Sequence, residues 1–86
     1  MEKIWIITID EVCDYENFRN APMAYRNEKD ARETLKTIKK RLQEDYAEDI
    51  EDGYVCYEEH DNSVEVYGDD YSREHYTAML TCVDLQ

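Results

Sequence analysis

One segment of the chain has the periodicity of an α-helix, whereas the apolar segments outside it alternate with a period of two. Between Asn27 and Gly53, apolar side chains recur at the three- and four-residue intervals that place them on one helix face. Asn27 is a favoured N-cap residue, and Gly53 is expected to end the helical segment. A single amphipathic helix among strands predicts a domain in which that helix packs on a sheet. The apolar stripe consists of Ala31, Leu35, Ile38, Leu42 and Tyr46.

Two strands are expected before the helix. Lys3 to Asp10 alternate with apolar side chains on both faces, which is typical of a central strand. Met23 to Tyr25 form a short second strand, which pairs antiparallel with the first because too few residues intervene for a crossover helix. The segment 11–21 has mixed polarity and precedes Pro22, so we expect a loop or a ragged extension of the first strand.

Three strands are expected after the helix. Residues 54–59 and 63–67 alternate with a period of two, and residues 60–62 between them (His-Asp-Asn) predict a hairpin turn. A break at 68–70 precedes a last strand at 75–85, for which we expect one buried and one half-buried face.

The predicted element order is therefore β-β-α-β-β-β. This order predicts an α+β two-layer sandwich, with one helix packed on an antiparallel sheet, as a single small acidic domain spanning residues 1–86. A chain of this length buries roughly 60 to 65% of its unfolded surface, so the core is small. The 42% hydrophobic content is nevertheless too high for an intrinsically disordered acidic chain.

Charge is distributed very unevenly along the chain. It has 22 acidic residues against 10 Lys and Arg, which gives a net charge of -12. Residues 28–42 hold six of the ten bases and have a net charge of +3, so the rest carries -15. The acidic body should repel phosphate, which argues against direct nucleic-acid binding by the basic helix. The acid run Glu44–Asp52 is expected to fray the helix, because carboxylates near a helix C-terminus oppose its dipole.

No metal or cofactor signal is recognisable. Cys13, Cys56 and Cys82 are widely spaced, and no C-x-x-C or H-x-x-x-H spacing brings two zinc ligands together. The acidic clusters 44–52 and 67–74 lack the ligand spacing of an EF-hand loop. With only two glycines, the chain has no phosphate-binding Gly-rich loop. We therefore expect no metal site and no cofactor.

The three cysteines and the short apolar segment near the N-terminus indicate the cellular compartment. An odd number of dispersed cysteines suits free thiols in a reducing cytoplasm better than a disulfide framework. The apolar stretch Ile4–Ile9 is too short for a signal peptide or a membrane span. A cytoplasmic protein without membrane contact is expected.

Catalysis is not indicated by any residue constellation. A Cys–His pair could form in space, but any chain with three Cys and two His offers such pairs by chance. Carboxylate pairs are equally uninformative among 22 acids, and a domain this small has little room for a deep pocket. We expect no enzymatic activity.

The sheet face opposite the helix is the candidate binding surface, because a two-layer domain leaves it open unless a partner covers it. Between residues 44 and 74 there are thirteen acids against Arg73 alone, together with several tyrosines. Tyrosine suits interfaces, although it is also enriched in strands generally. The tyrosines expected on the open face are Tyr54, Tyr57, Tyr67, Tyr71 and Tyr76. The candidate partner-binding residues are Tyr57, Glu58, Glu65, Tyr67, Asp69, Asp70 and Tyr71.

These features do not identify a partner, but they rank two hypotheses. The first is a small acidic adaptor-like or inhibitor-like module of bacterial or phage origin, which binds a basic protein surface such as that of a nucleic-acid-binding enzyme. Its carboxylates would then imitate a phosphate backbone, although acidic runs are usually just solvated faces. The alternative is a self-associating structural domain of a bacterial or phage protein without catalytic activity, in which a strand edge or the tyrosine face pairs with a second copy as a homodimer.

Overall fold

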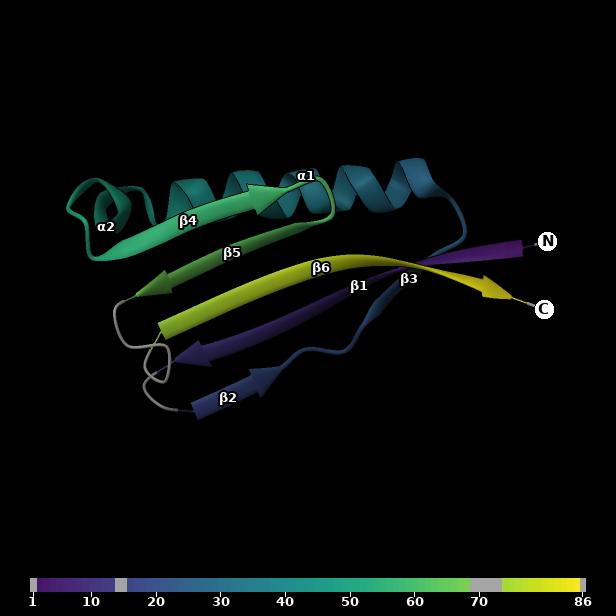
Figure 1. Ribbon diagram of the computed structural model, residues 1–86, viewed down its shortest axis with the longest axis horizontal. Helices are drawn as coiled ribbons and strands as arrows, with labels where there is room; N and C mark the ends of the chain where they lie inside the picture. Colours follow the sequence, from purple (N-terminus) through teal and green to yellow (C-terminus); the bar gives the residue numbers. More distant parts are fainter. Residues whose placement is uncertain (1, 14–15, 69–73, 86) are drawn as a thin grey trace.

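The computed structural model describes residues 2–13, 16–68 and 74–85. Its two longest strands, β1 (Glu2–Cys13) and β6 (Glu74–Leu85), are neighbours in the middle of the sheet. The two strands pair antiparallel over their whole length, from Glu2 opposite Leu85 to Cys13 opposite Glu74. The two ends of the chain therefore lie side by side (Figure 1). The elements are β1 (Glu2–Cys13), β2 (Glu16–Arg19), β3 (Met23–Tyr25), α1 (Glu28–Asp45), α2 (Ala47–Glu51), β4 (Val55–His60), β5 (Ser63–Gly68) and β6 (Glu74–Leu85).

All the strands join one antiparallel sheet of order β2-β1-β6-β5-β4, with β3 also paired to β1. Both β2 and β3 run along the same edge of β1, so they act as two parts of one strand interrupted around Pro22. The predicted α+β architecture and its order β-β-α-β-β-β are therefore confirmed. The antiparallel pairing predicted between the first strand and Met23–Tyr25 is confirmed as well.

The segment 11–21 is where the structure adds most to the sequence prediction. The first strand extends to Cys13, as one of the two expected alternatives, and β2 then pairs with its last four residues. The sequence pattern did not reveal β2, because its four residues, Glu-Asn-Phe-Arg, include a single apolar side chain. Pairing to β1, rather than local alternation, makes this segment a strand.

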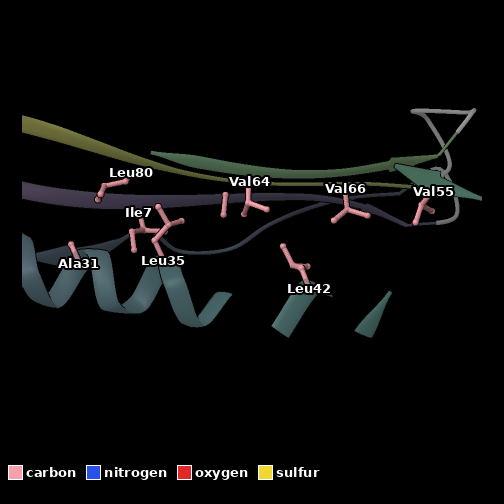
Figure 2. Packing of buried hydrophobic residues seen from close by; sticks show 9 residues of the cluster. Ile7, Ala31, Leu35, Leu42, Val55, Val64, Val66 and Leu80 are labelled. Carbon is pink, nitrogen blue, oxygen red and sulfur yellow. The ribbon is translucent and has the colours of Figure 1, made fainter. Parts of the chain in front are cut away.

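Asn27 caps the start of helix α1, as predicted. Its side-chain oxygen accepts a hydrogen bond from the Lys29 backbone N–H at 2.8 Å, which satisfies one of the free donors of the first turn. Ala31, Leu35 and Leu42 of the predicted stripe are buried against the sheet. Figure 2 shows them pointing from the helix toward side chains that project from the strands.

The acidic run 44–52 is helical over most of its length, contrary to the expected fraying. The helix α1 continues to Asp45, and α2 follows after Tyr46. Tyr46 and Ile50 pack against the core. Full burial of one such side chain contributes roughly 1.5 to 3 kcal/mol. Partial burial of both Tyr46 and Ile50 therefore outweighs the roughly 0.3 to 1 kcal/mol of one unfavourable charge near a helix end.

Gly53 ends the helical segment as predicted. Its φ angle of +81° lies in the left-handed region that favours glycine. The Gly53 N–H donates to the Ile50 carbonyl at 3.2 Å, and the Tyr54 N–H donates to the Asp49 carbonyl at 2.9 Å. This pair of bonds is the Schellman motif, which satisfies carbonyls at the helix end.

The core lies between α1 and one face of the sheet. The buried side chains from the strands all project to this face, which Figure 2 shows edge-on. The shortest dimension of the molecule is 15 Å, as expected for two layers. The core residues are Ile7, Ala31, Leu35, Leu42, Val55, Val64, Val66, Ala78 and Leu80.

Candidate binding surface

The sheet has one face packed against α1 and one face that no described helix or strand covers. Because side chains alternate along a strand, the register assigns each residue to a face. Ile7 pairs with Leu80 and Val64 pairs with Ala78 on the helix side. The strand residues of the uncovered face whose side chains the structure describes are Glu2, Ile4, Ile6, Thr8, Asp10, Val12, Ala24, Cys56, Glu58, His60, Ser63, Glu65, Tyr67, His75, Thr77, Met79, Thr81 and Val83.

A row of carboxylates crosses the uncovered face. Glu58 of β4 lies directly opposite Glu65 of β5, which is opposite Thr77 of β6, which is opposite Asp10 of β1. We call Asp10, Glu65 and Glu58 the acidic row. Like charges directly opposite each other disfavour strand pairing, so this arrangement is not explained by the stability of the sheet.

Tyr67 extends the acidic row along β5. Its hydroxyl donates a hydrogen bond to Oε1 of Glu58 at 2.9 Å. The bond joins neighbouring strands and holds the Glu58 carboxylate over the sheet. Of the seven residues predicted from sequence, the structure thus brings together Glu58, Glu65 and Tyr67 on one uncovered surface.

His75 lies beside the acidic row on β6. Its Nε2 is 2.9 Å from the Thr77 hydroxyl and 3.7 Å from Oε1 of Glu65. The side chains of His75 and Glu65 are 24% and 34% exposed, so both are partly shielded by their neighbours. When His75 is protonated, it forms an ion pair with Glu65.

Tyr57 lies on the opposite face, which corrects the expectation that it joins Glu58 on the uncovered surface. Adjacent strand residues point to opposite sides of a sheet, and Tyr57 is in register with buried Val66. Its hydroxyl donates to Oε2 of Glu59 at 2.9 Å and accepts from Nε2 of Gln43 at 3.2 Å. Burial, followed by the bond to Glu59, raises the pKa of Tyr57. The residue therefore links β4 to α1.

The other predicted tyrosines and acids are dispersed. Tyr76 lies on the helix side of β6, opposite Val66 and Glu11, which likewise corrects its expected place on the open face. Tyr54 precedes β4 and is 70% exposed. The predicted residues Asp69, Asp70 and Tyr71 lie outside the described residues.

A groove that the sequence did not reveal runs between α1 and the part of the sheet that contains β1 and β3. Its volume is about 520 Å³, and its apolar lining comes from partly buried side chains such as Ile9, Met23 and Ile38. Glu11 and Arg41 line it as well and act on the Tyr76 hydroxyl in opposite directions. Burial first, then Glu11, raises the pKa of Tyr76, and Arg41 lowers it. Since both signs of charge line the groove, its electrostatics select no ligand.

Two basic side chains of α1, Arg32 and Lys39, contact the protein itself. Arg32 donates to Oε2 of Glu28 at 3.1 Å and to the Asp61 carbonyl at 3.4 Å. Lys39 donates to the His60 carbonyl at 2.6 Å. The Arg32 guanidinium also lies 5.9 Å from the ring centre of Trp5, a cation–π distance. These contacts join the basic helix to its own first turn, to the turn between β4 and β5, and to β1.

The thiols of Cys56 and Cys82 are free and exposed. Within the described ranges 2–13, 16–68 and 74–85, no group of three or more His, Cys, Asp or Glu side chains could hold a metal ion. The helices among them are too short or too polar to cross a membrane.

Comparison with known proteins adds no assignment. The chain matches no known protein-family model, no curated protein and no solved structure. Any account of function therefore depends on the geometry and charge of the surfaces described above.

Proposed function

We propose that the protein is a binding module without catalytic activity, which engages a basic protein surface through the acidic row and Tyr67. The observation that carries the proposal is the placement of Glu58 directly opposite Glu65 on a sheet face that no described element covers. Repulsion between these carboxylates opposes folding, and Lys or Arg side chains of a partner would relieve it on binding.

Tyr67 adds an aromatic contact to the proposed surface. Its ring is half-buried and its hydroxyl is bonded to Glu58, so the pair is already ordered before a partner arrives. Ordered aromatic side chains lose little conformational entropy on binding, which is one reason tyrosine is frequent at interfaces.

The charge of the whole chain favours the same class of partner. A net charge of -12 on 86 residues produces a field that attracts basic proteins and repels nucleic acid. We therefore propose a basic protein, such as a nucleic-acid-binding enzyme whose Lys and Arg residues ordinarily contact phosphates. The free thiols of Cys56 and Cys82 suit the reducing cytoplasm, which we include in the proposal.

Charge reversal tests the proposal. The variant Glu58→Lys with Glu65→Lys reverses the acidic row on β4 and β5. A matched control, Glu44→Lys with Glu51→Lys, changes the net charge equally at exposed sites on α1 and α2. Both control residues lie in last helical turns, where lysine complements the helix dipole.

The measurement is capture from nuclease-treated bacterial lysate, elution by a salt gradient, and mass spectrometry. We expect a basic protein that is released at moderate salt from wild type and from the control variant, but is not retained by the acidic-row variant. Equal capture by all three proteins would refute a role for the acidic row. Equal loss from both variants would show that net charge alone causes retention.

Self-association is the second candidate, since Met79 and Val83 are large exposed hydrophobic residues on the uncovered face. In that case two copies would bury this face together. Light scattering across a salt series tests the idea, because added salt screens carboxylate repulsion between copies. A monomer at every salt concentration would eliminate it.

A further inference from the structure

The uncovered face carries an apolar stripe beside the acidic row. Ile4 lies opposite Val83, and Met79 lies opposite Thr8, on the adjoining strands β1 and β6. Ile6 lies between these pairs on β1, diagonal to both Met79 and Val83. Met79 is 48% exposed and Val83 is 39% exposed, whereas the two isoleucines are half-buried. We call Ile4, Ile6, Met79 and Val83 the apolar stripe.

The apolar stripe and the acidic row are close enough for one partner element to cover both. Met79 lies opposite Ser63, and Glu65 is two residues further along β5, with Glu58 one strand beyond. From the strand spacing of about 4.8 Å and the rise of about 3.3 Å per residue, Met79 and Glu58 are roughly 12 Å apart. This separation matches the diameter of an α-helix with its side chains, which is about 10 to 12 Å.

An α-helix is the element that best fits such a face. Sheet faces in α+β domains are covered by helices, as α1 covers the other side of this sheet. The stripe extends from Ile4 to Thr8 along β1, or about 13 Å, which corresponds to about nine helical residues at 1.5 Å per residue. A helix with apolar side chains at i, i+4 and i+7 presents them over this length.

The charge of the uncovered face disfavours a second copy of the chain as the element that covers it. Among the strand residues of this face whose side chains the structure describes, none is Lys or Arg. A second copy would therefore bring its own carboxylates toward the acidic row. A basic element has complementary charge and is favoured over a copy.

We infer that this face receives a basic amphipathic helix of a partner protein, with its apolar side chains on the apolar stripe and its Lys or Arg side chains toward Glu58 and Glu65. The inference rests on the proposed function and specifies the chemistry of its partner. The inference requires both the apolar stripe and the acidic row, whereas the proposed function requires only the acidic row.

Two synthetic peptides of identical Leu and Lys content separate the two ideas. One places Leu at helical intervals, and the other has the same residues scrambled so that no helical face is apolar. Fluorescence anisotropy gives the affinity of each for wild type and for Met79→Glu. The added carboxylate strengthens attraction to any cationic peptide, so weaker binding by this variant reports lost apolar contact.

We expect the amphipathic peptide to bind wild type at least about tenfold more tightly than the scrambled one, and Met79→Glu to remove that difference. Methyl NMR should show a shift at Met79 and none at Met23, which lines the groove beside α1. Equal affinities of the two peptides for wild type, or a shift at Met23 alone, would overturn the inference and leave the proposed function standing.

The variant Glu58→Lys with Glu65→Lys supplies the remaining comparison. It should weaken both peptides, because each carries the same cations. If it weakens neither while the Met79 effect persists, the proposed function fails, and so does the part of the inference that assigns lysines to the acidic row. If neither peptide binds wild type, the inference is overturned.

Discussion

The pair formed by Glu58 and Glu65 is predicted to destabilise the fold. The two residues are directly opposite on neighbouring strands, where side chains start about 5 Å apart at Cβ. Two unit charges about 6 Å apart in water repel by about 0.7 kcal/mol, and the screening at about 10 mM salt leaves roughly 0.6 kcal/mol. At about 1 M salt, screening reduces this repulsion to roughly 0.1 kcal/mol.

A double-mutant cycle isolates this repulsion from the other contacts of each residue. Glutamine keeps the shape and the hydrogen-bond acceptor, so Glu58→Gln can still accept from Tyr67. The single variants Glu58→Gln and Glu65→Gln, together with the double variant, give the coupling energy. Each single variant should relieve the repulsion, and the second substitution should add no further relief of that kind.

The assay is urea unfolding followed by the fluorescence of Trp5, the single tryptophan of the chain. Trp5 is half-buried and packs against the core, so its environment changes on unfolding. We expect a coupling of about 0.6 kcal/mol that decreases to about 0.1 kcal/mol as salt rises from about 10 mM to 1 M. A coupling near zero at low salt, or one that salt does not reduce, would refute the reasoning that the acidic row opposes folding.

Three further predictions concern the core, the helix start and alkaline stability. Leu35→Ala should reduce the free energy of unfolding by about 2 to 5 kcal/mol, because Leu35 is 2% exposed, whereas exposed Lys36→Ala should change it little. Asn27→Ala should lower stability by about 0.5 to 2 kcal/mol in thermal unfolding, and Asn27→Asp should retain the cap. Folding raises the pKa of Tyr76 above its ordinary value. The linked contribution to the free energy of unfolding is fully present below the ordinary tyrosine pKa and is lost as the pH rises through the folded-state pKa. Tyr76→Phe should therefore flatten the decline of urea midpoints above about pH 10, and an unchanged decline would contradict this linkage.

The helix and most of the strands could be predicted because their signals are local. The cap at Asn27, the apolar stripe of α1 and the period-two segments each arise within a few residues of one another. The turn between β4 and β5 was also predicted, although His60 pairs with Ser63 and the turn is therefore two residues long. Backbone geometry and side-chain periodicity explain why such features are readable in sequence.

The candidate surface could be predicted only in part, because faces are fixed by register and burial. Glu58, Glu65 and Tyr67 come together as the sequence suggested, whereas Tyr57 points to the helix side. A list of tyrosines and acids in one half of a chain does not say which side of a strand each side chain occupies. Side chains alternate between the two faces, so one buried position such as Val66 assigns every other residue of the strand to a face.

The sequence by itself determined the α+β class, the cap of the main helix at Asn27, the end of the whole helical segment at Gly53, and the excess of carboxylates, since these depend on local periodicity and composition. Tertiary structure alone decided that β2 is a strand, that the acidic run 44–52 is helical, and that the acidic row lies beside the apolar stripe. The physical reason is the same in each case. Long-range pairing to β1 and β6, and burial of side chains such as Ile50, override weak local preferences, and no local pattern encodes which strands become neighbours.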